Sequence, residues 1–242
     1  MNEDKIRIGE AVKILGVTAQ TLRNWEKSGK LLPERSAGKQ RYYSRETLGK
    51  FALDIQKLGL TWATSEIPPE LPSEYYCEHS DRFTSRLSKM GEILLKTENV
   101  SQDLASLITL IVGEIGDNSF AHNIGNWPDV TGIFYAYDFT KKIIVLADRG
   151  RGVKATLQQV RPNIATDMEA LTVAFTEVIS GRNPEKRGNG LKVVRRVLES
   201  NEISLVFRSG VGLVNILPST SKKMQITMAD NNIRGTYAVI SF

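Results

Sequence analysis

Three polar side chains follow one another at helical spacing near the middle of the chain. They are Glu114, Asn118 and His122, and they extend by threes and fours an apolar series formed by Leu104, Leu107 and Ile111. Burying an amide without a partner costs roughly 2–7 kcal/mol, so a bound polar ligand would remove the conflict on this face. The alternative is a helix that leaves the core and has its last turns in water.

A second candidate is Asp148-Arg-Gly-Arg-Gly, which stands at the end of an expected strand and before a helix. A carboxylate at this place accepts hydrogen bonds from an exocyclic amine, such as that of adenine. Gly150 and Gly152 let the backbone approach a flat ring. The simpler interpretation is a turn after a strand.

A third candidate is Gly188-Asn-Gly-Leu, which opens a helix and follows three cationic residues, Arg182, Lys186 and Arg187. The first amides of such a helix can point at a phosphate, and the helix dipole favours the anion. A glycine hinge with a solvated basic face is the alternative. Gly235-Thr236, at the start of the last expected strand, means little alone.

Other common sites are excluded. The P-loop pattern Gly-x-x-x-x-Gly-Lys-Ser/Thr is absent. Gly150-Arg-Gly-Val-Lys-Ala resembles a Rossmann glycine turn, but residues 165–170, where the acidic strand end is required, are expected to start a helix. One cysteine, Cys77, forms no internal disulfide, and with only His79 and His122 beside it a structural zinc site is not expected.

These residues need helices and strands to hold them. Strand-like runs are expected at 131–137 and 142–147, and again at 203–208, 211–217, 224–228 and 236–242. Helices are expected at 75–96, 104–123, 155–160, 168–179 and 191–199. Helices over a mostly antiparallel sheet predict an α+β layered domain.

Charge separates the first quarter of the chain from the rest. Residues 1–60 contain 12 Lys+Arg and 7 Asp+Glu, whereas the remaining residues contain 20 of each. A polyanionic partner is therefore expected at the N-terminal part. The chain shows no apolar run of about 20 residues and no apolar signal region, so we expect a cytoplasmic protein.

The N-terminal part has the pattern of a helix-turn-helix. Residues 8–15 predict a short helix, Gly16-Val17 a turn, and Thr18 the cap of a second helix over 19–27. This helix is expected to bury Leu22 and Trp25. Its outward side chains are of types that read base edges or hold phosphates in a major groove: Gln20, Thr21, Arg23, Asn24 and Lys27.

A wing and a third helix are expected to follow. The polar turn 36–40 is flanked by basic and aromatic residues, which predicts a wing that places Arg35, Lys39, Arg41 and Tyr42 near DNA. Ser44 is expected to cap a third helix with an apolar face of Leu48, Phe51, Ala52, Ile55 and Leu58.

The run Ile8-Gly-Glu-Ala-Val-Lys-Ile-Leu-Gly-Val-Thr-Ala-Gln-Thr-Leu-Arg-Asn-Trp-Glu-Lys-Ser-Gly, followed by Arg41-Tyr-Tyr-Ser, resembles the winged helix-turn-helix of the MerR family. The resemblance covers about residues 5–58 and implies binding to double-stranded DNA. The long dimerising helix and the metal-sensing cysteines of that family are missing, so its effector sensing does not carry over. The alternative is a three-helix protein-interaction module.

The later motifs resemble, in their order, the GHKL ATPase superfamily of gyrase B subunits, Hsp90, MutL, histidine kinases and anti-sigma-factor kinases. They are Glu114-x-x-x-Asn118, Asp148-x-Gly-x-Gly, Gly188-x-Gly-Leu and Gly235-Thr. The resemblance spans about residues 100–242 and implies a Bergerat-type α/β sandwich with ATP between sheet and helices. The chain is thus expected to consist of a small all-α winged helix-turn-helix domain (1–58), a linker and connecting helix (59–100) and an ATP-binding domain (101–242).

The resemblance also implies roles for single residues. Asn118 matches the asparagine that holds Mg²⁺ against the phosphates, Glu114 the general base of the hydrolysing members, and Asp148 the adenine-binding aspartate. Gly188 and Gly190 match the glycines that close the lid. The full set expected to contact ATP is Asn118, His122, Asp148, Gly150, Gly152, Lys186, Gly188, Gly190, Leu191 and Thr236. His122 resembles the anti-sigma kinase pattern, whereas Asp117-Asn118-Ser119 resembles gyrase and MutL.

Two functions compete. The first is an ATP-dependent regulator in which the nucleotide domain switches a MerR-like DNA-binding module, with ATPase activity. The second is an anti-sigma-type serine/threonine kinase acting on a STAS-like or other regulatory protein. A sensor histidine kinase is less favoured because His79 lacks the usual sequence around a phosphoacceptor histidine. Passive nucleotide binding is a third possibility. A nucleotide-dependent homodimer is expected to accompany the first function.

Overall fold

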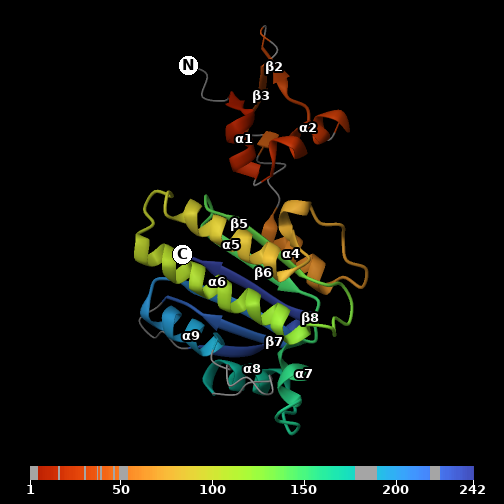
Figure 1. Ribbon diagram of the computed structural model, residues 1–242, viewed down its shortest axis with the longest axis vertical. Helices are drawn as coiled ribbons and strands as arrows, with labels where there is room; N and C mark the ends of the chain where they lie inside the picture. Colours follow the sequence, from red (N-terminus) through yellow and green to blue (C-terminus); the bar gives the residue numbers. More distant parts are fainter. Residues whose placement is uncertain are drawn as a thin grey trace. The chain divides into compact units, whose positions relative to one another are not determined.

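The computed structural model describes residues 5–15, 17–29, 31–36, 38, 40–45, 47–48, 54–177, 190–218 and 224–242 (Figure 1). The chain divides into two compact units, Met1–Ile55 and Gln56–Phe242. The two units are described separately below.

The first unit contains the predicted helix-turn-helix. Helices α1 (Ile8–Leu15) and α2 (Ala19–Lys27) pack through a small apolar core. The hydroxyl of Thr18 accepts a hydrogen bond from the amide of Thr21 at 3.0 Å, so the predicted cap of α2 is confirmed. Leu22 is fully buried and Trp25 packs at the edge of this core, which consists of Ile6, Ala11, Leu15, Val17, Leu22, Leu31, Tyr43 and Leu48.

The expectation that this domain is all-α is wrong. Three short strands, β1 (Ile6–Arg7), β2 (Glu34–Arg35) and β3 (Arg41–Tyr43), form an antiparallel sheet in the order β1-β3-β2. The aromatic run at residues 41–43 favours a strand, and its buried Tyr43 pairs with Ile6. Strands β2 and β3 are the two arms of the predicted wing, closed by a 3.1 Å hydrogen bond from the amide of Ser36 to the carbonyl of Gln40.

The third predicted helix does not run through to residue 58. The Ser44 hydroxyl accepts from the Thr47 amide at 3.0 Å, as expected of a cap, but Phe51 and Ala52 lie outside the described residues. Asp54 is not helical, and a separate helix, α4 (Ile55–Thr64), begins after it. Aspartate favours the position before a helix, which is consistent with a new start here.

The second unit is built on a five-stranded antiparallel sheet. Its strands are β4 (Tyr76–Cys77), β5 (Ile133–Asp138), β6 (Ile143–Asp148), β7 (Ser204–Ile216) and β8 (Gln225–Ser241), in the order β4-β5-β6-β8-β7. The four short strands expected after residue 203 are instead two long ones. Both strands continue through the gaps expected at 209–210 and 229–235, and their pairing has register shifts around Gly210.

Helices α5 (Ser80–Leu94), α6 (Gln102–Asn123) and α9 (Gly190–Ser200) run across one face of this sheet (Figure 1). Their apolar side chains join alternate residues of the strands, such as Ile133, Tyr135 and Leu146, in one core. Helices α7 (Gly152–Gln158) and α8 (Asp167–Thr176) follow β6 and pack against β7 and each other. The domain is therefore a mixed helix and sheet structure with a helical layer over an antiparallel sheet.

Helix α4 packs on the strand residues that this core does not use. A Cβ placed on Gly59 would lie 2.9 Å from Phe134 and 3.0 Å from Val145, so α4 touches β5 and β6 directly. The 3₁₀ turn Ser73–Tyr75, strand β4 and helix α5 follow, and β4 pairs with β5. Residues 59–100, predicted as a linker and connecting helix, thus contribute to the sheet and core of the second unit.

Helix α6 has the length and mean hydropathy (1.2) that would suffice to cross a membrane, by these criteria alone. In this protein it is a core helix: nine of its 22 residues are buried, against α5, α9 and the sheet.

Candidate functional site

The centre of the site in the second unit is Asp148, the last residue of β6. Its side chain is buried, and its Oδ2 accepts hydrogen bonds from the hydroxyls of Ser119 (2.8 Å) and Thr236 (2.5 Å). Its Oδ1 accepts from the amide of Gly150 at 2.8 Å. Residues from α6, β6 and β8 thus meet at one carboxylate.

Burial raises the pKa of Asp148 above its usual range, because a charged carboxylate is disfavoured away from water. Hydrogen bonds from Thr236, Gly150 and Ser119 act in the opposite direction and offset part of this effect. The bond from the Gly150 amide is an ordinary Asx turn, whereas the hydroxyls of Ser119 and Thr236 come from two other elements and are not part of that turn.

Gly235 allows the close approach of β8 to Asp148. Its φ is +65°, and a Cβ at this position would lie 2.2 Å from Asp148 Oδ1 and 2.4 Å from the Asp148 carbonyl oxygen. Any side chain would therefore clash and would also be strained by the left-handed backbone. The Gly235-Thr236 pair, weak as a sequence signal, is required where it stands.

Ser119 and Asn123 connect α6 to the glycine-containing loop after β6. The Asn123 Oδ1 accepts from the amide of Arg151 at 2.9 Å, and its Nδ2 donates to the Ser119 carbonyl at 2.8 Å. Both residues are buried. Neither residue is among those that the sequence predicts to bind ATP. The pattern that could have indicated them is a pair of polar residues four apart on the buried face of α6.

The predicted stripe of α6 lies differently from the expectation. The buried face is formed by Ile108, Ile111, Val112, Ile115 and Ser119, whereas Leu104, Leu107, Glu114, Asn118 and His122 are only partly buried along its flank. The helix turns 100° per residue, so Leu104 and His122, five full turns apart, lie on one line, and the predicted stripe stays beside the buried face along the whole helix. Glu114 and Asn118 therefore occupy the edge and not the interior of the core.

This edge faces the start of α9. A Cβ on Gly190 would lie 2.5 Å from Glu114 Oε2 and 3.2 Å from Asn118 Nδ2, so the first turn of α9 contacts both side chains. Leu191 packs at the rim of the core beside them. Lys186 and Gly188, predicted to belong to the same site, lie outside the described residues.

A cleft of about 460 Å³ lies beside the glycine-containing turns at 150–152 and 235. Gly150, Gly152 and Gly235 form part of its wall, together with the cationic residues Arg151, Lys154 and Arg234. Asp148, Glu114 and Asn118 do not line it. Among the described residues, no three His, Cys, Asp or Glu side chains gather in a way that would hold a metal ion alone.

The first unit presents a polar surface on α2. Gln20, Arg23, Asn24 and Lys27 are exposed and Thr21 is partly exposed. Gln20 Nε2 donates to Asn24 Oδ1 at 3.0 Å, and Arg23 donates to Gln20 Oε1 at 3.4 Å. These contacts align donors and acceptors along one helix face, as reading of base edges requires.

The wing is fastened to α2 by Glu26. Its carboxylate accepts from Arg41 Nε at 2.7 Å and from Arg35 on the neighbouring strand. The hydrogen bond from Arg35, and then that from Arg41, lowers the pKa of Glu26. Arg41, expected to lie near DNA, is thus also part of the wing's attachment, and the Tyr42 hydroxyl donates to Gln40 at 2.9 Å. Lys39 lies outside the described residues.

Comparison with known proteins gives one match, between residues 7–43 and the model of the MerR family regulatory proteins. No curated protein and no solved structure matches the chain. The matched segment contains α1, α2 and the wing. Residues 7–43 are therefore a MerR-like helix-turn-helix domain, of the kind that binds DNA in regulators of transcription.

Proposed function

We propose that this protein is a DNA-binding regulator whose second unit binds ATP in a GHKL-type site and thereby alters the action of the MerR-like domain. The observation that carries the proposal is the convergence of four segments far apart in the chain. Thr236, Ser119 and Gly150 meet at the buried carboxylate of Asp148. On the same helix as Ser119, the adjacent Asn118 and Glu114, just over one turn earlier, meet the start of α9.

The residues fit a nucleotide in their chemistry. Asp148 is an acceptor suited to an exocyclic amine, and the Ser119 and Thr236 hydroxyls now bonded to it can rotate to accommodate that amine. Mg²⁺ takes few protein ligands and completes its shell with phosphate oxygens and water, so the amide oxygen of Asn118 would be one ligand of an ion held mainly by the phosphates. The amide of Gly190, at the start of an 11-residue helix, is placed to donate to an anion.

In this proposal each residue has a defined task. Asp148 holds the base, Asn118 orients Mg²⁺, and Glu114 accepts a proton from water that attacks the terminal phosphate. ATP supplies the phosphoanhydride bond that is broken. Gly235 and Gly152 keep the backbone close enough for a planar ring to lie against it.

Radiolabelled ATP tests the assignment. Wild-type protein should release free phosphate, and Glu114→Ala should bind ATP with unchanged affinity but lose hydrolysis by about 10²-fold or more, the usual scale for a positioned base. Asn118→Ala should instead lose the Mg²⁺-dependent part of binding.

Two results would contradict parts of this proposal. Label transferred to a co-purified protein would identify a kinase of the anti-sigma type. Absence of ATP binding in calorimetry would refute the nucleotide site altogether and leave the MerR-like domain with a second unit of another kind.

A further inference from the structure

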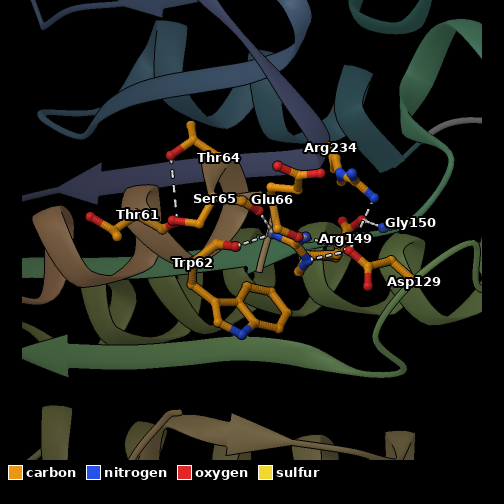
Figure 2. Close-up of polar contacts among 10 residues, drawn as sticks. Thr61, Trp62, Thr64, Ser65, Glu66, Asp129, Arg149, Gly150 and Arg234 are labelled. Carbon is orange, nitrogen blue, oxygen red and sulfur yellow. Dashed lines mark hydrogen bonds and ion pairs between the residues drawn. The ribbon is translucent and has the colours of Figure 1, made fainter. Parts of the chain in front are cut away.

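Arg149 lies inside the Asp148–Gly152 loop, yet its side chain points away from Asp148 and is fully buried. A guanidinium has five N–H groups, and here each has an acceptor. Nε donates to Asp129 at 2.7 Å, and one terminal nitrogen also pairs with Asp129. The remaining donors reach backbone carbonyl oxygens (Figure 2).

One of those carbonyls is in the last turn of helix α4, and the other two belong to the residues that directly follow the helix. Arg149 donates to the carbonyls of Trp62, Ser65 (2.8 Å) and Glu66 (3.2 Å). The last carbonyls of a helix have no partner within it, and a cation at this end is favoured by the helix dipole. The Trp62 ring completes the contact, with its centroid 5.9 Å from the guanidinium carbon.

Asp129 supplies the charge that a buried cation needs. It lies in the segment after α6 and also accepts from Arg234 on β8 at 3.3 Å. Arg149 is fully buried whereas the Asp129 side chain is 21% exposed, so removing Asp129 would leave an uncompensated cation inside the protein. Arg149, Asp129 and the end of α4 thus connect the loop of the candidate site to a helix on the opposite face of the sheet.

We propose that Arg149 is a positioning residue that transmits nucleotide occupancy of the Asp148–Gly152 loop to helix α4. The inference rests on the proposed function, because it takes that loop as part of the nucleotide site. Helix α4 begins at Ile55, the residue at which the DNA-binding unit ends, so it is the first element that follows that unit along the chain. Fixing the loop fixes the Arg149 backbone, and the three hydrogen bonds to the carbonyls of Trp62, Ser65 and Glu66 then fix the end of α4.

A structural anchor alone would stabilise the fold without passing on occupancy. Coupling is reciprocal, so disturbing the link must change both the response of α4 and the affinity for nucleotide. Lysine keeps the charge but has its three donors on one nitrogen. That nitrogen cannot reach all of the acceptors that the planar guanidinium of Arg149 reaches. Arg149→Lys therefore weakens the link, and Arg161→Lys is a matched control, since Arg161 makes an exposed ion pair with Glu177.

The test is hydrogen exchange on the full chain, with and without a non-hydrolysable ATP analogue whose occupancy is measured by calorimetry. In wild-type protein the analogue should slow exchange both at 150–152 and at 62–66. In Arg149→Lys it should bind about 5- to 150-fold more weakly, the usual range of coupling, and slow exchange only at 150–152. Arg161→Lys should behave as wild type.

If the exchange rate at 62–66 in wild-type protein were unchanged when the analogue is bound, the inference would be overturned. This comparison uses wild-type protein only, so it does not depend on whether a variant folds. An Arg149→Lys protein in which α4 still responds fully would also overturn the inference. If wild-type protein binds no analogue, the proposed function fails on its own. In that case the link is tested by comparing the two proteins without nucleotide. Arg149→Lys should then accelerate exchange at both 150–152 and 62–66, and acceleration at one of these segments alone would refute the link.

Discussion

Asp148 is held by contacts that a turn aspartate does not need, because donors from α6 and β8 reach it in addition to the amide of its own turn. It is buried, its oxygens accept from two hydroxyls and a backbone amide, and a glycine at 235 is required beside it. A carboxylate held in this way presents acceptors of fixed direction. Such an arrangement is suited to selecting a ligand by the position of its N–H groups.

The first prediction at this scale concerns nucleotide affinity. Asp148→Asn should weaken ATP binding by about 1–3 kcal/mol, because an amide nitrogen replaces an acceptor and faces the donor of the base. Calorimetry measures the effect, with Asp103→Asn as a control, since Asp103 is exposed in the first turn of α6. Equal affinity of wild-type and Asp148→Asn protein would mean that the base does not bind at this residue.

The second prediction follows from the raised pKa of Asp148. A carboxyl that binds its proton more tightly in the folded state stabilises the fold most below the unfolded pKa of about 3.9, and this stabilisation is lost as pH rises through the higher folded pKa. The free energy of unfolding of wild-type protein should therefore fall relative to that of Asp148→Asn as pH increases above about 4. Urea unfolding of both proteins across pH 3.5–7 measures it, and a constant difference would contradict the assignment.

Site residues whose roles depend on the local sequence pattern could be predicted, and those whose partners lie far away in the chain could not. Asp148 and Gly150 stand at and just after the end of β6, whereas Gly235 lies inside β8, and the structure brings the three together. The role of Arg149 could not be predicted, because its partners are Asp129 and backbone carbonyls more than 80 residues away, which no spacing reveals. Ser119 and Asn123 were missed for a related reason: they lie on the face of α6 that the three-and-four stripe leaves aside.

Helix α2 and the wing are joined by ion pairs of Glu26. Two arginines on the wing share one carboxylate of α2, so the orientation of the hairpin depends on a charge balance within the domain. Arg23 is different: it is exposed, and its described hydrogen bond is to Gln20. Arg23 is therefore the clearer donor to a DNA phosphate.

The third prediction is that Arg23→Ala reduces the slope of log affinity against log salt by about 0.9, as expected for the loss of one phosphate contact on duplex DNA. Binding to a duplex titrated at several salt concentrations measures the slope. Lys89→Ala, an exposed cation on α5, should leave it unchanged. An unaltered slope in Arg23→Ala would show that α2 does not face the backbone as proposed.

Elements with strong local signals were predicted well, and those set by tertiary contacts were not. The cap at Thr18 placed α2, and continuous apolar runs placed β5 and β6. The pattern of the third N-terminal helix extends to Ile55 and Leu58, so the sequence assigns the start of α4 to that helix and the rest of α4 to a linker. Its actual place is decided by Gly59, which allows it to contact Phe134 and Val145.

Across the whole chain, the first 60 residues contain the entire excess of positive charge, and the candidate nucleotide site lies in the second unit. The proposed function requires that nucleotide binding in the second unit changes how the first unit binds DNA. Nucleotide-dependent association of two chains would bring two helix-turn-helix domains together and raise DNA affinity through effective concentration, without new base contacts.

The most direct measurement of this claim is a DNA titration at one fixed salt concentration with ADP, with a non-hydrolysable ATP analogue and with no nucleotide. The account predicts that the affinity for DNA differs between the analogue and the other two conditions, and that Asp148→Asn abolishes the difference. Identical DNA affinities in all three conditions, with the analogue shown by calorimetry to be bound, would contradict it.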